Sequence, residues 1–132
     1  MLLMQYDAFR TDSRFNGAID LLLSHWSRRK EKWRLYGFGI GDRFNELKYP
    51  DAIYGILRVL DVLSMFPYAV DTNEFTDMLN FVLNKSSNGK YYAESVSRPY
   101  SEFDFGQTKA PSRWITFLIN GIQKRVNACK EG

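Results

Sequence analysis

Apolar residues recur every three or four positions in four stretches of the chain, which is the spacing that gathers side chains on one face of an α-helix. The first stretch covers residues 12–30, and its apolar positions are Phe15, Ile19, Leu22, Leu23 and Trp26. Asp12 or Ser13 is suited to cap the start of this helix. The second stretch lies between Pro50 and Pro67, and its apolar positions are Ile53, Ile56, Leu57, Leu60 and Leu63. We predict a buried helix there, starting with Asp51 as its cap and ending at Pro67.

The third and fourth stretches lie in the second half of the chain. Asp71 and Glu74 have the spacing of a capping box, and they precede the apolar positions Phe75, Met78, Leu79 and Val82. The fourth helix is expected to begin at Pro111, with Ser112 as its cap. Its apolar side is expected to consist of Trp114, Phe117, Leu118, Ile122 and Val126. This pattern predicts that Trp114 is a core residue, so that its replacement by alanine costs about 3–5 kcal/mol.

The segments between these helices are rich in glycine, proline and aromatic residues. Gly37, Gly39 and Gly41 alternate in a loop after the first helix, Asn88-Gly89 is a strong turn dipeptide, and residues 93–110 show no regular pattern. We therefore predict an all-α fold with little or no sheet, built from antiparallel helix pairs joined by long Gly/Pro/aromatic loops. Residues 1–132 are expected to form a single domain, with a first helix pair at 12–66 and a second at 71–128.

Composition and charge narrow the class of protein. The chain has 132 residues, of which 45% are hydrophobic, and its formal net charge is +3. This charge is too small to indicate nucleic-acid binding. If the basic cluster at residues 28–34 did bind nucleic acid, the binding would weaken steeply with added salt, and finding no such binding would exclude this function. The single cysteine, Cys129, suits a reducing cytoplasm. We expect no transmembrane segment and no signal peptide at residues 1–9, because no apolar run is long enough and Asp7 interrupts the first one.

Two segments, KSSNGKY (85–91) and KAPSRWITFLI (109–119), carry a family resemblance. The first resembles the Gln-x-x-x-Gly-x-Trp repeat of squalene and hopene cyclases, with Lys85 in place of Gln and Tyr91 in place of Trp. The second resembles the segment that begins an inner helix in these proteins. The chain is therefore similar to the α/α-toroid family, which includes protein prenyltransferase β subunits, and the resemblance implies a fragment of a toroid of stacked helix pairs. In that family the Gln and Trp side chains tie a helix end to a neighbouring turn.

The sequence speaks against the catalytic chemistry of that family. The cyclases use an Asp-x-Asp-Asp motif, and the most similar stretch here, Glu102 to Phe105, lacks the last carboxylate. The prenyltransferases bind zinc through Asp, Cys and His, whereas this chain has Asn127 before Ala128 and Cys129, and a single histidine, His25, in another helix. A packed or surface histidine is the expected state of His25. We therefore expect no cofactor, no metal site and no catalytic residues.

The long loop and the helix that follows it contain the candidate ligand-binding residues. They are Tyr54, Tyr91, Glu94, Asp104, Gln107, Arg113 and Trp114. Aromatic walls with a few polar groups are typical of a ligand site. In the alternative interpretation Glu94, Asp104 and Arg113 pair with one another and hold the loop in place, because charges in a packed loop need partners.

These observations favour a non-catalytic binding or assembly module, whose partner is a second copy, further helix pairs of a longer chain, or an apolar small molecule. The alternative is an enzyme, or part of one, that acts on an isoprenoid or another apolar molecule. Upstream helix pairs with an Asp-rich motif would favour the enzyme, and a stable dimer would favour the module.

Overall fold

The computed structural model describes residues 7–31, 43–50, 55–103 and 106–131, and these are mostly helical, as predicted. Six α-helices are present in this part of the chain: α1 (Asp7–Arg10), α2 (Asn16–Ser27), α3 (Ile56–Leu63), α4 (Pro67–Val70), α5 (Asn73–Leu83) and α6 (Arg113–Glu131). The same described ranges contain two 3₁₀ turns, η2 (Ser13–Phe15) and η3 (Arg98–Tyr100), and two short strands, β1 (Lys48–Tyr49) and β2 (Ser95–Val96). None of the helices in the described ranges is long and apolar enough to cross a membrane.

Polar side chains define where several of these helices begin. Ser112 Oγ accepts from the amide of Ile115 at 3.2 Å, so the predicted cap of the last helix is confirmed. Asp12 also acts as a cap, but it accepts from the amide of Arg14 and starts η2, the turn that precedes α2. The predicted cap Asp51 lies outside the described residues.

The predicted capping box at the third helix is wrong. Thr72 is the cap of α5, and its Oγ1 accepts from the amide of Phe75 at 3.2 Å. Asp71 cannot take this place because the chain first forms α4, and Asp71 lies at the C-terminal end of that short helix. Pro67 therefore does more than end the preceding helix, since it also occupies the first turn of α4, where its missing amide hydrogen costs nothing.

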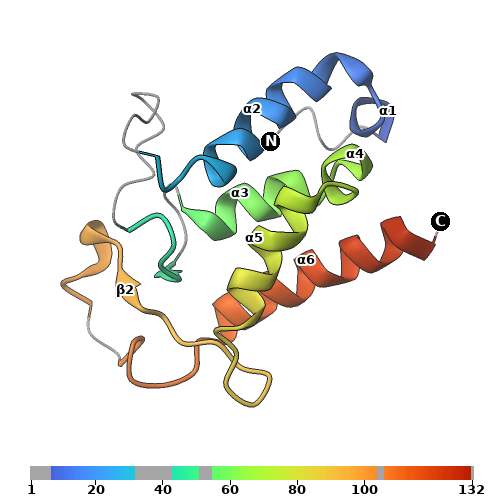
Figure 1. Cartoon of the computed structure of the whole chain (residues 1–132). Coiled ribbons are helices and arrows are strands. Elements are labelled where there is room, and N and C mark those ends of the chain that lie inside the picture. The colour runs from blue at the N-terminus through green and yellow to red at the C-terminus, as the bar shows by residue number, and fades with distance from the viewer. Residues whose placement is uncertain (1–6, 32–42, 51–54, 104–105, 132) are drawn as a thin grey trace.

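The helices pack around α3, which lies against both α5 and α6 (Figure 1). Helix α2 packs on α5 from the other side. The main helix contacts therefore join α2 with α5 and α3 with α5 and α6, and they differ from the predicted pairing of consecutive helices. Buried apolar side chains explain this arrangement, because Ile56, Leu57, Leu60 and Leu63 form one wide face of α3, and α5 and α6 both pack against α3.

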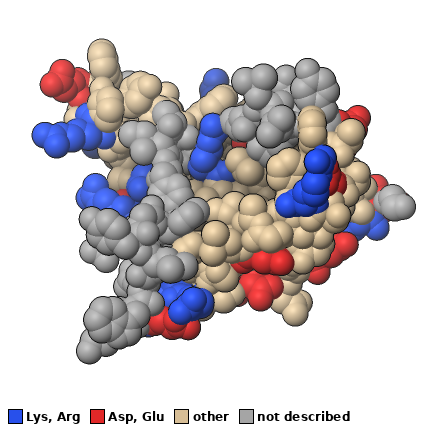
Figure 2. Space-filling model, turned by 90° about the horizontal axis from the view of Figure 1, so that it is seen from above, with Lys and Arg blue, Asp and Glu red and all other residues tan. Residues whose placement is uncertain are grey.

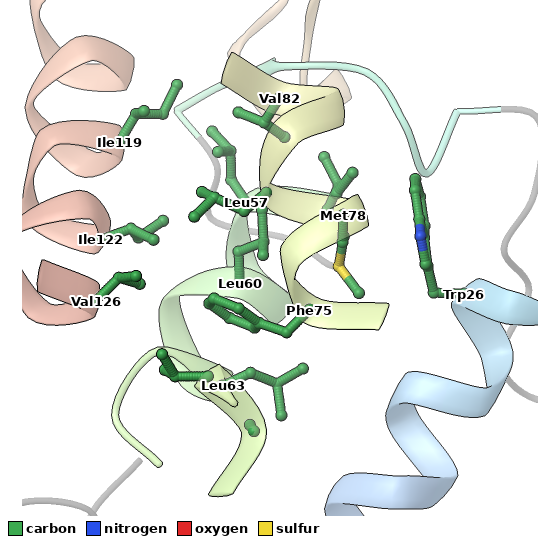
Figure 3. Packing of buried hydrophobic residues seen from close by; sticks show 14 of the residues in the cluster. Trp26, Leu57, Leu60, Leu63, Phe75, Met78, Val82, Ile119, Ile122 and Val126 are labelled. Atoms are coloured by element: carbon green, nitrogen blue, oxygen red, sulfur yellow. The ribbon is translucent and has the colours of Figure 1, made fainter. Parts of the chain in front are cut away.

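A single apolar core fills the space between these helices (Figure 3). From α3, the side chains of Leu57, Leu60 and Leu63 point into it. They meet residues of α5 and α6, and Trp26 of α2 lies at the edge of the same cluster. The residues labelled on α5 and α6 are Phe75, Met78, Val82, Ile119, Ile122 and Val126.

A small parallel sheet ties the loop before α3 to the long loop before α6. Lys48 pairs with Ser95, and Tyr49 pairs with Val96. The small size of this sheet agrees with the prediction of little or no sheet. It brings Tyr49 next to the loop at residues 93–110, and Tyr92 in turn forms a bridge with Pro111 at the entrance to α6.

Candidate binding surface

A pocket of about 340 Å³ lies where the long loop meets the start of α6. Its walls include Tyr49 from β1, Gln107 and Pro111 from the loop, and Arg113 and Trp114 from the first turn of α6. Three of the predicted site residues, Gln107, Arg113 and Trp114, are therefore brought together. Sequence reasoning missed Tyr49, because its position follows from the pairing of two strands of two residues each.

Backbone hydrogen bonds hold the loop side of this pocket. Gly106 has a φ of 73°, a left-handed conformation that glycine adopts without strain, and its carbonyl accepts from the amides of Lys109 and Ala110. Gln107 is buried, and its Nε2 donates to the carbonyl of Phe103 at 2.7 Å. The wall is thus a fixed turn, which favours a pre-formed pocket.

Trp114 and Phe117 form an exposed aromatic pair beside the pocket. Their ring centroids are 5.9 Å apart with an interplanar angle of 24°, so the rings are stacked. Trp114 is 47% exposed and Phe117 is 66% exposed. The indole Nε1 of Trp114 donates to the carbonyl of Pro50 at 2.7 Å, which fixes the orientation of the ring.

The prediction that Trp114 is a core residue is wrong. The buried side of α6 consists of Ile115, Ile119, Ile122 and Val126, and Trp114 projects from the other side of the helix. Residue 115 rather than 114 begins the buried stripe, because α3 packs against that side. Trp114 therefore lines the candidate site, as predicted, but it is not a core residue.

Arg113 provides the charge of the pocket. It is exposed, and it makes no ion pair within the described part of the chain. Among the described residues that line the pocket there is no aspartate or glutamate. The predicted pairing of Arg113 with Glu94 is therefore wrong, and the other proposed partner, Asp104, lies outside the described residues.

Glu94 holds a different junction, together with Lys85. Glu94 Oε2 lies 2.6 Å from Lys85 Nζ and accepts from the amide of Leu47 at 2.7 Å. Lys85 Nζ also donates to the carbonyl of Asn45 at 2.8 Å. These contacts tie the end of α5 to residues 45–47 and to the start of the long loop. The expectation that Glu94 helps to pin a loop is met, but with Lys85 as its partner.

Another predicted candidate, Tyr91, is not among the described residues that line the pocket. Tyr91 is 4% exposed and belongs to the core, where its backbone amide donates to Thr116 Oγ1 and its carbonyl accepts from the amide of Ser112. It therefore positions the start of α6 rather than a ligand. Tyr54 lies outside the described residues.

Two residues of the basic cluster at 28–34, Arg28 and Arg29, make local contacts at the end of α2. Arg28 pairs with Glu31 at 2.8 Å, and the guanidinium of Arg29 lies 3.8 Å from the ring centroid of Trp26. Trp26 Nε1 donates to Asp77 of α5 at 2.7 Å. On the face shown in Figure 2, basic and acidic residues are interspersed among the others rather than gathered by sign.

His25, Asp12 and Tyr68 are not among the described residues that line the pocket. His25 is buried in α2, in line with a packed histidine. Hydrogen bonding by Arg14 lowers the pKa of Asp12, and a hydrogen bond to Asp20 raises the pKa of Tyr68. Within the described ranges, no cluster of three or more His, Cys, Asp and Glu residues could hold a metal ion.

Comparison with known proteins adds no assignment: no family model matches the chain, and neither a curated protein nor a solved structure does. The geometry itself, a pocket with one guanidinium beside two stacked and exposed rings, is suited to non-covalent binding.

Proposed function

We propose that this chain is a non-catalytic helical binding or assembly module, and that Trp114, Phe117 and the adjoining pocket form its contact surface. The observation that carries this proposal is the stacked pair of exposed rings on the outer side of α6. Below, "contact surface" refers to Trp114, Phe117 and the pocket lined by Tyr49, Gln107, Pro111 and Arg113.

The exposure of these rings supports a role in association. Complete burial of one large apolar side chain contributes about 1.5–3 kcal/mol, so two half-exposed or largely exposed rings represent unused binding energy. Trp, Tyr and Arg are also the residue types that contribute most to protein interfaces, and the contact surface contains one of each. The hydrogen bond from Trp114 to Pro50 reduces the entropy that its ring loses on binding.

The resemblance to the α/α-toroid family forms part of this proposal. In the repeat that KSSNGKY resembles, a side chain ties a helix end to a neighbouring turn. Lys85 makes such a tie here, through Asn45 and Glu94, and Tyr91 at the other end of the segment is buried. These contacts support the proposal that the chain is a short or partial relative of the prenyltransferases and cyclases that uses the fold for binding.

Binding of Nile red, an uncharged dye that fluoresces in apolar contacts, tests the proposed surface. We expect the wild-type chain to bind the dye, and we expect the double variant Trp114→Ala/Phe117→Ala to lose most of that signal. Leu21→Ala/Tyr68→Ala is the matched control, because it removes two other exposed apolar side chains of the molecule. Equal dye binding by the wild type and the Trp114/Phe117 variant would show that the surface is not the contact site.

A further inference from the structure

The described part of the contact surface carries a positive charge from Arg113. Arg113 makes no ion pair in the described part of the chain, and the other described residues that line the pocket carry no negative charge. Along residues 106–118, which include the loop wall and the first turns of α6, the charged residues are Lys109 and Arg113. Both are exposed and both are cations. An approaching group of negative charge would therefore be attracted to these two cations and would meet no like charge among the described residues of the pocket wall.

The shape of the surface favours a segment of a protein over a small molecule. A small-molecule site encloses most of its ligand. Here the pocket opens beside Trp114, and the stacked ring of Phe117 continues the apolar surface outside it, on an exposed side of α6. A ligand that covers Phe117 as well as the pocket must extend along the helix, as a peptide segment does.

We infer that the contact surface recognises an acidic, apolar peptide segment of a partner protein. An apolar side chain of this segment enters the pocket beside Trp114, a neighbouring one covers Phe117, and an Asp or Glu of the segment pairs with Arg113. This inference rests on the proposed function and adds the chemistry of the partner. Charge complementarity supplies the preference for acids, and the two rings supply the apolar part of the contact.

A matched set of peptides tests this chemistry directly. Fluorescein-labelled peptides of twelve residues, with Leu and Phe placed next to Glu, are compared with the same peptides in which every Glu is replaced by Gln or by Lys. Fluorescence anisotropy with the full chain measures the binding. We expect the Glu peptides to bind at least tenfold more tightly than the Gln peptides, and we expect added salt to reduce this difference.

Charge reversal at Arg113 provides the sharper test. Arg113→Glu is expected to abolish the preference for Glu peptides and to create a preference for the Lys peptides. Lys124→Glu is the matched control, since it makes the same change of charge at an exposed position further along α6. Circular dichroism spectra of both variants show whether the helices are retained.

The outcomes separate this inference from the proposed function. If Nile red binding depends on Trp114 and Phe117 but the peptides show no dependence on the sign of their charge, the inference is overturned and the proposed function stands. If sedimentation velocity shows a dimer that Phe117→Ala dissolves, while no peptide binds, the partner is a second copy and the inference is again overturned. If Nile red binding is unchanged in the Trp114/Phe117 variant, the proposed function itself fails.

Discussion

Helix α6 carries large apolar side chains on two sides, and one side is buried in the core whereas the other is exposed. One side presents Ile115, Ile119 and Ile122, each 0% exposed, to the leucines of α3. The other side presents Trp114 and Phe117 with about half or more of their surface exposed. The difference lies in the neighbours, because α3 covers the first side whereas the carbonyl of Pro50 binds one edge of the indole on the second.

Under the proposed function, the buried side of α6 serves stability and its exposed side serves binding. The buried isoleucines contribute apolar area that is removed from water on folding, and their loss also leaves cavities. The exposed rings of Trp114 and Phe117 lose less contact with water on folding and so contribute less to stability. A substitution series along α6 should therefore divide into variants that unfold the protein and variants that leave it folded.

The largest effect is expected on the buried side, from Ile119→Ala. This change removes buried methyl and methylene groups at a position that is fully enclosed between α3 and α6, so the free energy of unfolding should fall by about 3 kcal/mol. Urea denaturation followed by circular dichroism measures this loss. Phe117→Ala, two residues away on the exposed side, is the control. If Ile119→Ala lowers the free energy of unfolding by less than about 1 kcal/mol, as a surface substitution does, this side of α6 is not part of the core.

An intermediate effect is expected at Arg125, which lies between the two sides. Its Nε donates to Ser64 Oγ at 2.9 Å, and its Nη2 pairs with Asp61, so α6 is joined to the end of α3. Arg125→Met keeps much of the aliphatic length but leaves both partners without this donor, and it should cost about 1–3 kcal/mol.

Thermal and urea unfolding measure the effect at Arg125, and Lys124→Met is the control on the adjacent exposed position. The pair of variants removes the same charge from neighbouring residues. If the two variants are equally stable, the junction contributes nothing beyond the loss of a surface charge, and the boundary between the two sides of α6 is less sharp than the contacts indicate.

The sequence predicted the existence of α6 and its cap, but it placed the buried stripe incorrectly. Trp114, Phe117 and Leu118 have helical spacing, and so do Ile115, Ile119 and Ile122, because the helix is apolar over a wide arc. Local pattern cannot choose between two such stripes. The choice depends on where α3 packs, which is a contact between residues about 60 positions apart in the chain.

The same limit explains which site residues were predicted. Gln107, Arg113 and Trp114 lie within eight positions of one another, so a loop followed by a helix start was enough to bring them together. Tyr49 reaches the pocket because β1 pairs with β2, which lies more than 40 residues further along the chain. Strands of two residues are too short to show an alternating apolar pattern, so this pairing could not be predicted from the sequence. Glu94 was expected to pair with Arg113, but it forms its ion pair with Lys85, which follows the end of α5.

The smallest effect is expected on the exposed side, from Trp114→Ala. About half of the ring already contacts water, and its main fixed contact is the hydrogen bond to Pro50, so the loss of stability should be about 1 kcal/mol or less. Urea unfolding of Trp114→Ala measures this loss, and Trp114→Phe, which keeps a ring for stacking but removes the donor, separates the hydrogen bond from the ring contact. Phe117→Ala should change stability by about 0.5 kcal/mol at most. A loss of about 3 kcal/mol for Trp114→Ala, the value typical of a buried aromatic, would mean that this side is also core. The small expected loss is what allows the contact surface to be tested, because variants that stay folded report on binding alone.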